Sequence, residues 1–333
     1  ICTGIAVVII PIVCLYLLQC LLVPKYASDI KEGAMIKEYY NSEKNHDVLI
    51  LGDCEVYKNI STVTMWENYG ISSYIRGSAE QLIWQSYYLL EDTLKYEKPQ
   101  VVILNVLAMT ESDAKNEAYN RMTLDGMKLS KYKIASIRES MTEEENMASY
   151  IFPLLRYHSR WSELSSEDFR YMWKTPSVTT NGYLMQKGVR PVTTIPKAAP
   201  LANYTFSSRN MEYLDKIYSL CKDNDINLVL MKAPSVYPHW YDEWDRQVSD
   251  YADEHGILYL NTIDEAENIG IDYTTDTFDY GQHLNVEGAE KLSLYLGEQL
   301  VKNFRLTDHR QDESYKNAWK TIVNKYYEEK QGD

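Results

Sequence analysis

Short apolar runs that alternate with helix-length segments constrain the fold of this chain more than any other feature. The first run, residues 48–51, contains only valine, leucine and isoleucine and is bounded by polar residues, as in a parallel strand buried on both faces. A short strand at 71–75, an amphipathic helix at 79–96 and a buried strand at 100–106 follow. This order predicts βαβ crossovers and therefore a parallel sheet.

The pattern is interrupted once and then returns. Residues 107–205 hold a polar helical segment at 142–160 and many prolines and glycines, which indicates an insertion that shapes a groove above the sheet. Helices and strands then alternate again, ending in a helix, at 207–222, 226–232, 241–255, 257–261 and 286–303. We therefore expect one α/β domain over residues 47–305.

The two ends of the chain differ from this domain. Residues 1–23 carry no charge and, at about 1.5 Å per residue, are long enough to cross a hydrocarbon core of roughly 30 Å. They predict one N-terminal transmembrane anchor, followed by a charged helical stalk at 24–46. Because a single N-terminal span before a large soluble region is typical of a signal anchor, we expect a single-pass cell-membrane protein with its main domain outside the cytoplasm. Residues 306–333 form a charged tail that contains tyrosine and tryptophan, and one interpretation is that it folds back on the domain.

Charge and cysteine content exclude several classes of partner. The net charge of -14, from 34 basic and 48 acidic residues, disfavours nucleic acid, which needs basic patches. Five scattered cysteines without a CxxC pair argue against a disulfide framework and a structural zinc site. We expect no metal and no cofactor.

A thiol and an imidazole are expected to meet at one edge of the sheet. Cys54 follows the first strand, and His283 lies in the loop 276–285 between the last strand and the final helix. Ligands of open α/β sheets collect at the carboxyl ends of the strands, where both residues fall. Beside a helix N-terminus and a histidine, the pKa of the Cys54 thiol is expected to fall toward neutrality.

The sequence around these residues resembles the SGNH/GDSL hydrolase superfamily from about residue 45 to residue 305. Gly52-Asp53-Cys54-Glu55 looks like the first block, with Cys54 where the family usually has serine. Gly77 resembles the second-block glycine, and Asn105 falls near the third block, although the family's Gly-x-Asn-Asp is absent. Asp279 and His283 resemble the last block, but they stand four apart instead of three.

The resemblance implies a three-layer α/β/α fold with a flavodoxin-like parallel sheet, and a role for each matched residue. Cys54 would be the nucleophile, His283 the base and Asp279 the orienting acid, with Asp276 as the alternative acid. Gly77 and Asn105 would form the oxyanion hole. Further residues after the strands would line the substrate groove: Asp53, Glu55, Lys232 and Trp240. For Lys232 and Trp240, packing beneath the insertion is an equally consistent interpretation.

Membrane-anchored relatives of this shape assist D-alanylation of teichoic acids or O-acetylate envelope polysaccharides. The resemblance therefore implies an esterase or O-acyltransferase that acts on a cell-envelope polysaccharide, with a membrane-bound O-acyltransferase as an expected partner. The alternative is that the exchange of serine for Cys54 marks an inactive protein, which binds glycan or assists such an acyltransferase.

Overall fold

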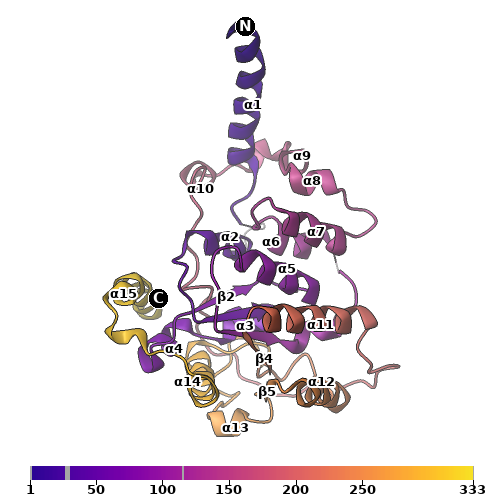
Figure 1. Ribbon diagram of the computed structural model, residues 1–333, viewed down its shortest axis with the longest axis vertical. Coiled ribbons are helices and arrows are strands. Elements are labelled where there is room, and N and C mark those ends of the chain that lie inside the picture. The colour runs from indigo at the N-terminus through magenta and orange to yellow at the C-terminus, as the bar shows by residue number, and fades with distance from the viewer. Residues whose placement is uncertain (1, 27–30, 115, 333) are drawn as a thin grey trace.

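A computed structural model describes residues 2–26, 31–114 and 116–332 of the chain (Figure 1). Its centre is a sheet of five parallel strands in the order β2-β1-β3-β4-β5, which is the flavodoxin-like arrangement. The prediction of an α/β fold with a parallel sheet is thereby confirmed. The strands are β1 (Val48–Gly52), β2 (Ser73–Gly77), β3 (Val101–Asn105), β4 (Asn227–Lys232) and β5 (Leu258–Asn261).

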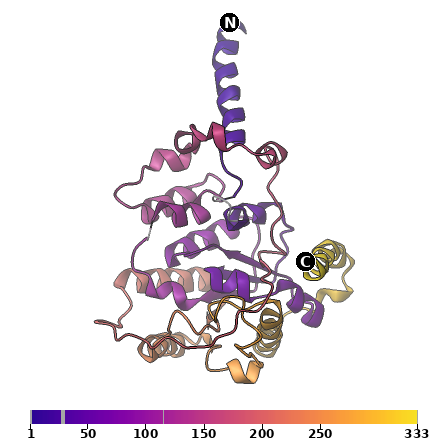
Figure 2. The same cartoon turned by 180° about the vertical axis from the view of Figure 1, so that it is seen from behind.

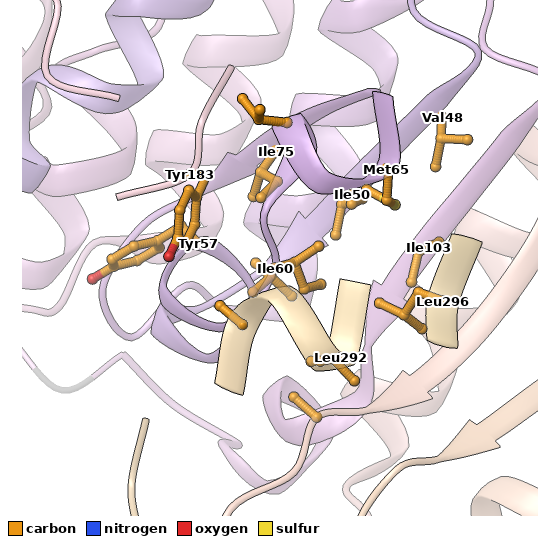
Figure 3. Close-up of a cluster of buried hydrophobic side chains, with 14 of the residues drawn as sticks. Val48, Ile50, Tyr57, Ile60, Met65, Ile75, Ile103, Tyr183, Leu292 and Leu296 are labelled. Carbon is orange, nitrogen blue, oxygen red and sulfur yellow. The ribbon is translucent and has the colours of Figure 1, made fainter. Parts of the chain in front are cut away.

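Alternate side chains of the strands enter two separate hydrophobic clusters, one on each face of the sheet. Val48 and Ile50 of β1 belong to the first cluster, whereas Leu49 and Leu51 belong to the second. This division follows from the two-residue period of a strand. Figure 3 shows the first face, where Ile103 lies beside Leu296 and Ile75 lies on the side of Tyr57 and Tyr183.

Helices cover both faces, so the domain has three layers. The first face is covered by α3 (Cys54–Asn59), α4 (Thr62–Tyr69) and α14 (Val286–Asn303). The second is covered by α5 (Ile83–Thr93), α11 (Ser208–Asp223) and α12 (Asp242–His255). One more short helix, α13 (Ala266–Ile269), follows β5.

The insertion consists of short helices and a long extended segment. Its helices are α6 (Glu117–Leu124), α7 (Lys131–Ser140), α8 (Met147–Ile151), α9 (Leu154–Tyr157) and α10 (Ser166–Arg170). The single helix expected at 142–160 is divided, because Pro153 cannot continue the hydrogen bonding of α8. The extended part runs beside β2, where the Ile75 N–H donates to the Asn181 carbonyl at 3.0 Å.

The N-terminal helix α1 (Cys2–Leu22) projects away from the domain and contacts α9 and α10 (Figures 1 and 2). Among the described residues, the structure contains no helix that is long and apolar enough to cross a bilayer. The membrane anchor at residues 1–23 stays a prediction.

The segment expected to be a stalk, residues 24–46, is not a free stalk: its described residues from 31 onward fold against the domain. Met35, Ile36 and Tyr39 are buried, and α2 (Met35–Glu38) packs on the domain. The apolar side chains of this segment are the physical reason, since a free stalk would leave them in water.

The C-terminal segment expected as a charged tail contains a helix, α15 (Glu313–Gln331), that docks on α4. Trp319 stacks on Trp66 with ring centroids 4.9 Å apart, and Tyr326, seven residues later, is also buried. Residues seven apart share one face of a helix, so this face holds α15 against the domain.

Candidate active site

The carboxyl ends of β1 and β3 form the switch point of the sheet. From β1 the chain crosses to β2 on one side, and β3 then lies on the other side of β1. Crevices at such points are the usual ligand sites of doubly wound folds. Asp53, Cys54 and Glu55 follow β1 there, and Asn105 ends β3.

Two glycines allow the backbone to pack closely at this point. Gly52 has φ 155°, and a Cβ placed on it would lie 2.8 Å from the Cβ of Asn105. Gly77, its register partner on β2, would place a Cβ 3.0 Å from the Gly52 carbonyl oxygen. Gly52 therefore requires glycine, and a side chain at Gly77 would have to displace its neighbours.

Asp53 starts helix α3 and so places Cys54 at its first residue. The Asp53 Oδ1 accepts the Glu55 backbone N–H at 3.0 Å, as an N-cap does. Burial, followed by the charge of Asp53, raises the pKa of the Cys54 thiol well above its ordinary value, with Lys58 opposing. This direction is opposite to the one expected from the sequence. The positive end of this short helix already holds a carboxylate, so it does not stabilise a thiolate.

Asp279 holds His283 by two hydrogen bonds. The His283 Nδ1 lies 2.6 Å from Asp279 Oδ2, and the His283 backbone N–H donates to Oδ1 at 2.7 Å. Burial opposes ionisation of Asp279, but the hydrogen bond and charge of His283 outweigh it and keep the pKa of this carboxyl below its ordinary value. Asp276 binds other partners, chiefly Lys291 at 2.6 Å and the Asp272 backbone N–H at 2.8 Å.

The loop of His283 is joined to the helix of Cys54. The Leu284 backbone N–H donates to Asn59 Oδ1 at 2.8 Å, and Asn59 is the last residue of α3. Lys58, on the same helix, lowers the pKa of both Cys54 and Asp279, so it lies within electrostatic reach of both. Among the described residues, no hydrogen bond joins the Cys54 Sγ to the His283 ring, although such bonds are often loose before substrate binds.

Behind Cys54 lies a buried ion pair, Glu55 with Lys232. The Lys232 Nζ is 2.8 and 2.9 Å from the two Glu55 oxygens, and both side chains are fully buried. It also donates to the Ala233 carbonyl at 2.7 Å and to Ser235 Oγ at 3.0 Å. These two residues, expected to line a groove, are therefore buried instead, and they fix the start of α3 to the end of β4.

Asn105 connects the same cluster. Its amide Nδ2 donates to Asp53 Oδ1 at 3.2 Å and to Glu55 Oε2 at 3.0 Å, and its Oδ1 accepts the Ala233 N–H. Both amide hydrogens are thus directed at carboxylates, so an oxyanion role for Asn105 would require one of them to be released.

Trp240 is buried among aromatic side chains beside this cluster. Its ring lies 5.8 Å from Lys232 Nζ, and its Nε1 donates to Asp245 at 3.2 Å. It packs against Phe206 and Trp244, so it is a buried packing residue, and its contacts lie outside residues 107–205. The sequence interpretation did not single out Asn59, which is a fully buried amide at the end of the short helix α3.

Asp53 gives the site a measurable pH dependence. Burial, and then the charge of Glu55, raise the pKa of Asp53 to about 7. The folded state therefore binds this proton more tightly than the unfolded chain does. As a result, the contribution of Asp53 to the free energy of unfolding falls as the pH rises toward 7. Asp53→Asn keeps the capping oxygen but cannot ionise, so its free energy of unfolding should fall less between about pH 5 and about pH 8 than that of the wild type. Urea unfolding at both pH values tests this, and identical changes in the two proteins would contradict it.

Comparison with known proteins returns low similarity. No protein-family model matches the sequence, and no curated protein matches it. Among solved structures, a GDSL-like lipase from Bacteroides thetaiotaomicron matches with a TM-score of 0.39 and 11% identity, covering 82% of this chain and 100% of that one. A proposed acylhydrolase from Bacteroides fragilis matches with a TM-score of 0.38 and 11% identity, covering 79% and 90%.

Proposed function

We propose that this protein is an SGNH-type enzyme that hydrolyses or transfers acyl esters of a cell-envelope polysaccharide. Cys54 is the nucleophile, His283 the base and Asp279 the orienting acid. The observation that carries the proposal is the 2.6 Å contact between His283 Nδ1 and Asp279, in a loop that is hydrogen-bonded to the helix of Cys54. The uncharged residues 1–23 would anchor the enzyme at the membrane, near such a polymer.

The raised pKa of the thiol decides how the first step runs. Cys54 is protonated at neutral pH, so His283 must remove its proton while the sulfur attacks the acyl carbonyl. The Asp279 carboxylate requires a hydrogen on Nδ1, which leaves Nε2 free to accept that proton. His283 then returns the proton to the alcohol oxygen as the carbon–oxygen bond breaks, and a thioester remains on Cys54.

The second step reverses these roles. His283 takes a proton from water or from a sugar hydroxyl, whose oxygen attacks the thioester, and the departing sulfur recovers the proton. Backbone N–H groups of Gly77 and Cys54 are the proposed oxyanion donors, each worth about 3 kcal/mol. Asn105 contributes indirectly, by holding Asp53 and Glu55 in place.

Acyl capture tests the proposal directly. We expect p-nitrophenyl acetate to acetylate Cys54, as measured by peptide mass spectrometry after an acid quench, with loss of the label in hydroxylamine. Cys221 is the internal control, because its thiol is buried in α11, on the other face of the sheet from Cys54. Release of nitrophenolate without any acyl group on Cys54 would contradict the proposed nucleophile.

An inactive glycan-binding or acyltransferase-assisting protein is the second candidate. Two observations favour it: the raised pKa of the Cys54 thiol, and the lack of a hydrogen bond between Cys54 and His283 among the described residues. Saturable binding of an envelope polysaccharide by a protein whose Cys54 is never acylated would support this candidate over the enzyme.

A further inference from the structure

Five large apolar side chains of the insertion are exposed, and their helices stand where α1 leaves the domain. Figures 1 and 2 show α9 and α10 at the foot of α1, with α8 beside α9. The five side chains are between 56% and 64% exposed, and no other phenylalanine or tryptophan of the described residues is as exposed. Exposed apolar groups that gather in one region mark contact sites. We call this group the apolar collar: Phe152, Leu155, Trp161, Phe169 and Trp173.

Arg160 ties the segments of the apolar collar to the end of α1. Its Nη1 donates to the carbonyl of Leu22, the last residue of α1, at 2.7 Å. Its Nη2 lies 2.8 and 2.9 Å from the two oxygens of Asp168, a buried residue of α10. The turn that carries Trp161 begins at Arg160 itself. The position of the apolar collar relative to α1 is therefore fixed by the fold.

Trp173 lies along the side of α1 and not only at its end. Its ring is 6.4 Å from the ring of Tyr16, centroid to centroid. Residue 16 precedes the end of α1 by six positions, or about 9 Å along the helix axis. From Ile9 to Tyr16 the side chains of α1 are exposed. The apolar collar thus reaches the level at which the domain stops covering α1.

The composition of α1 indicates what surrounds the apolar collar. Residues 5–18 contain no charged or amide side chain, so α1 is apolar on all sides, as is typical of a helix surrounded by lipid. A second protein chain would cover one face of α1 and leave the others in water. Tryptophan is enriched where a membrane meets water, because its ring is apolar and its N–H is polar.

The charges beside the apolar collar do not call for an anionic surface. Three basic and two acidic side chains of residues 152–174 are exposed, so they nearly balance: Arg156, Arg170 and Lys174 against Glu163 and Glu167. Burial of apolar groups is therefore the main source of attraction, and a neutral bilayer suffices.

We propose that the apolar collar lies in the interfacial layer of a lipid bilayer, so that the insertion, as well as α1, holds the domain against the membrane. This surface rests on the proposed anchoring by residues 1–23 and is independent of the chemistry at Cys54. It gives the insertion a second role besides shaping the groove above the sheet.

Tryptophan emission of the full chain, reconstituted in phosphatidylcholine vesicles, tests the apolar collar. We expect lipid brominated near the top of its acyl chains to quench the wild type, compared with unbrominated lipid. Trp161→Phe/Trp173→Phe should lose most of this quenching, because it keeps two apolar rings but removes both exposed indoles. Trp244→Phe is the matched control, since Trp244 lies in α12, at the opposite end of the domain from α1 (Figure 1).

A second variant tests whether the apolar collar enters the lipid. Phe152→Glu/Phe169→Glu places two charges in it, so the quenching of Trp161 and Trp173 should fall while α1 keeps the protein on the vesicles. Both phenylalanine side chains are exposed, so the variant should fold. Val301→Glu, an exposed position of α14, should leave the quenching unchanged.

Flotation of the vesicles separates the apolar collar from the anchor. A protein that floats with the vesicles but whose emission brominated lipid does not quench would overturn the proposal and leave the anchor intact; a second copy covering the apolar collar would give this result. Equal quenching of the wild type and Phe152→Glu/Phe169→Glu would also overturn it. A protein that does not float contradicts both the anchor and the apolar collar. Turnover of p-nitrophenyl acetate tests Cys54 alone, and none of these variants should change it.

Discussion

Cys54→Ala is expected to lower turnover of p-nitrophenyl acetate by at least about a thousandfold, because the atom that forms the thioester is lost. The fold should survive, since the change removes one sulfur atom and the Cys54 thiol makes no hydrogen bond among the described residues. Steady-state rates, with circular dichroism to check folding, are the measurement. Unchanged turnover in a folded Cys54→Ala protein would exclude Cys54 as the nucleophile.

Cys54→Ser provides the matched variant for this experiment. Because the wild-type thiol is protonated and depends on His283 for activation, a serine hydroxyl can enter the same proton transfer. We expect Cys54→Ser to keep measurable turnover that Cys54→Ala lacks, and His283→Ala to remove it from both the cysteine and the serine form. A Cys54→Ser protein as inactive as Cys54→Ala would show that the site needs sulfur chemistry.

Lys232→Met is expected to destabilise the domain by roughly 3–5 kcal/mol, the usual cost of removing one member of a buried ion pair. The Glu55 carboxylate would stay buried, with the Asn105 amide as its remaining partner among the described residues. The same change should weaken the attachment of α3 to β4, so activity should fall as well. Urea unfolding at neutral pH measures the stability change.

The double variant Glu55→Gln/Lys232→Met separates the ion pair from ordinary packing. It removes both charges, so it should recover most of the stability that Lys232→Met loses. A double variant as unstable as Lys232→Met alone would mean that the cost comes from the shape of the side chain. A loss below about 1 kcal/mol in the single variant would show that water or another cation replaces Lys232.

The sheet could be predicted because its strands are local patterns. The runs around Ile50, Ile103 and Val229 are apolar on both faces, and the structure makes all three parallel strands within one or two residues of the expected bounds. The strand expected at 71–75 is found at Ser73–Gly77 instead. Its apolar content is low, so the pairing with β1 sets its bounds more than its own sequence does.

The order of the strands predicts which residues of the site lie at the same edge of the sheet, and no more. That order places Cys54, Gly77 and the His283 loop at one edge, but it says nothing of contacts between side chains far apart in sequence. Glu55 and Lys232 are separated by 177 positions, and no local pattern encodes their pairing. The direction of the Cys54 pKa was wrong from sequence for a related reason: burial is a property of the assembled fold.

The backbone contact between Ile75 and Asn181 has a consequence for association between copies of the chain. β2 is an edge strand, and such edges recruit strands from other molecules unless they are obstructed. Here the insertion occupies the middle of that edge, and Gly182, with φ 87°, permits its close approach. Lys325 of α15 in turn holds Thr179 from outside. The helix α15 thus helps to hold the segment that covers this edge, so loss of α15 is expected to leave β2 more open to pairing with a second copy of the chain.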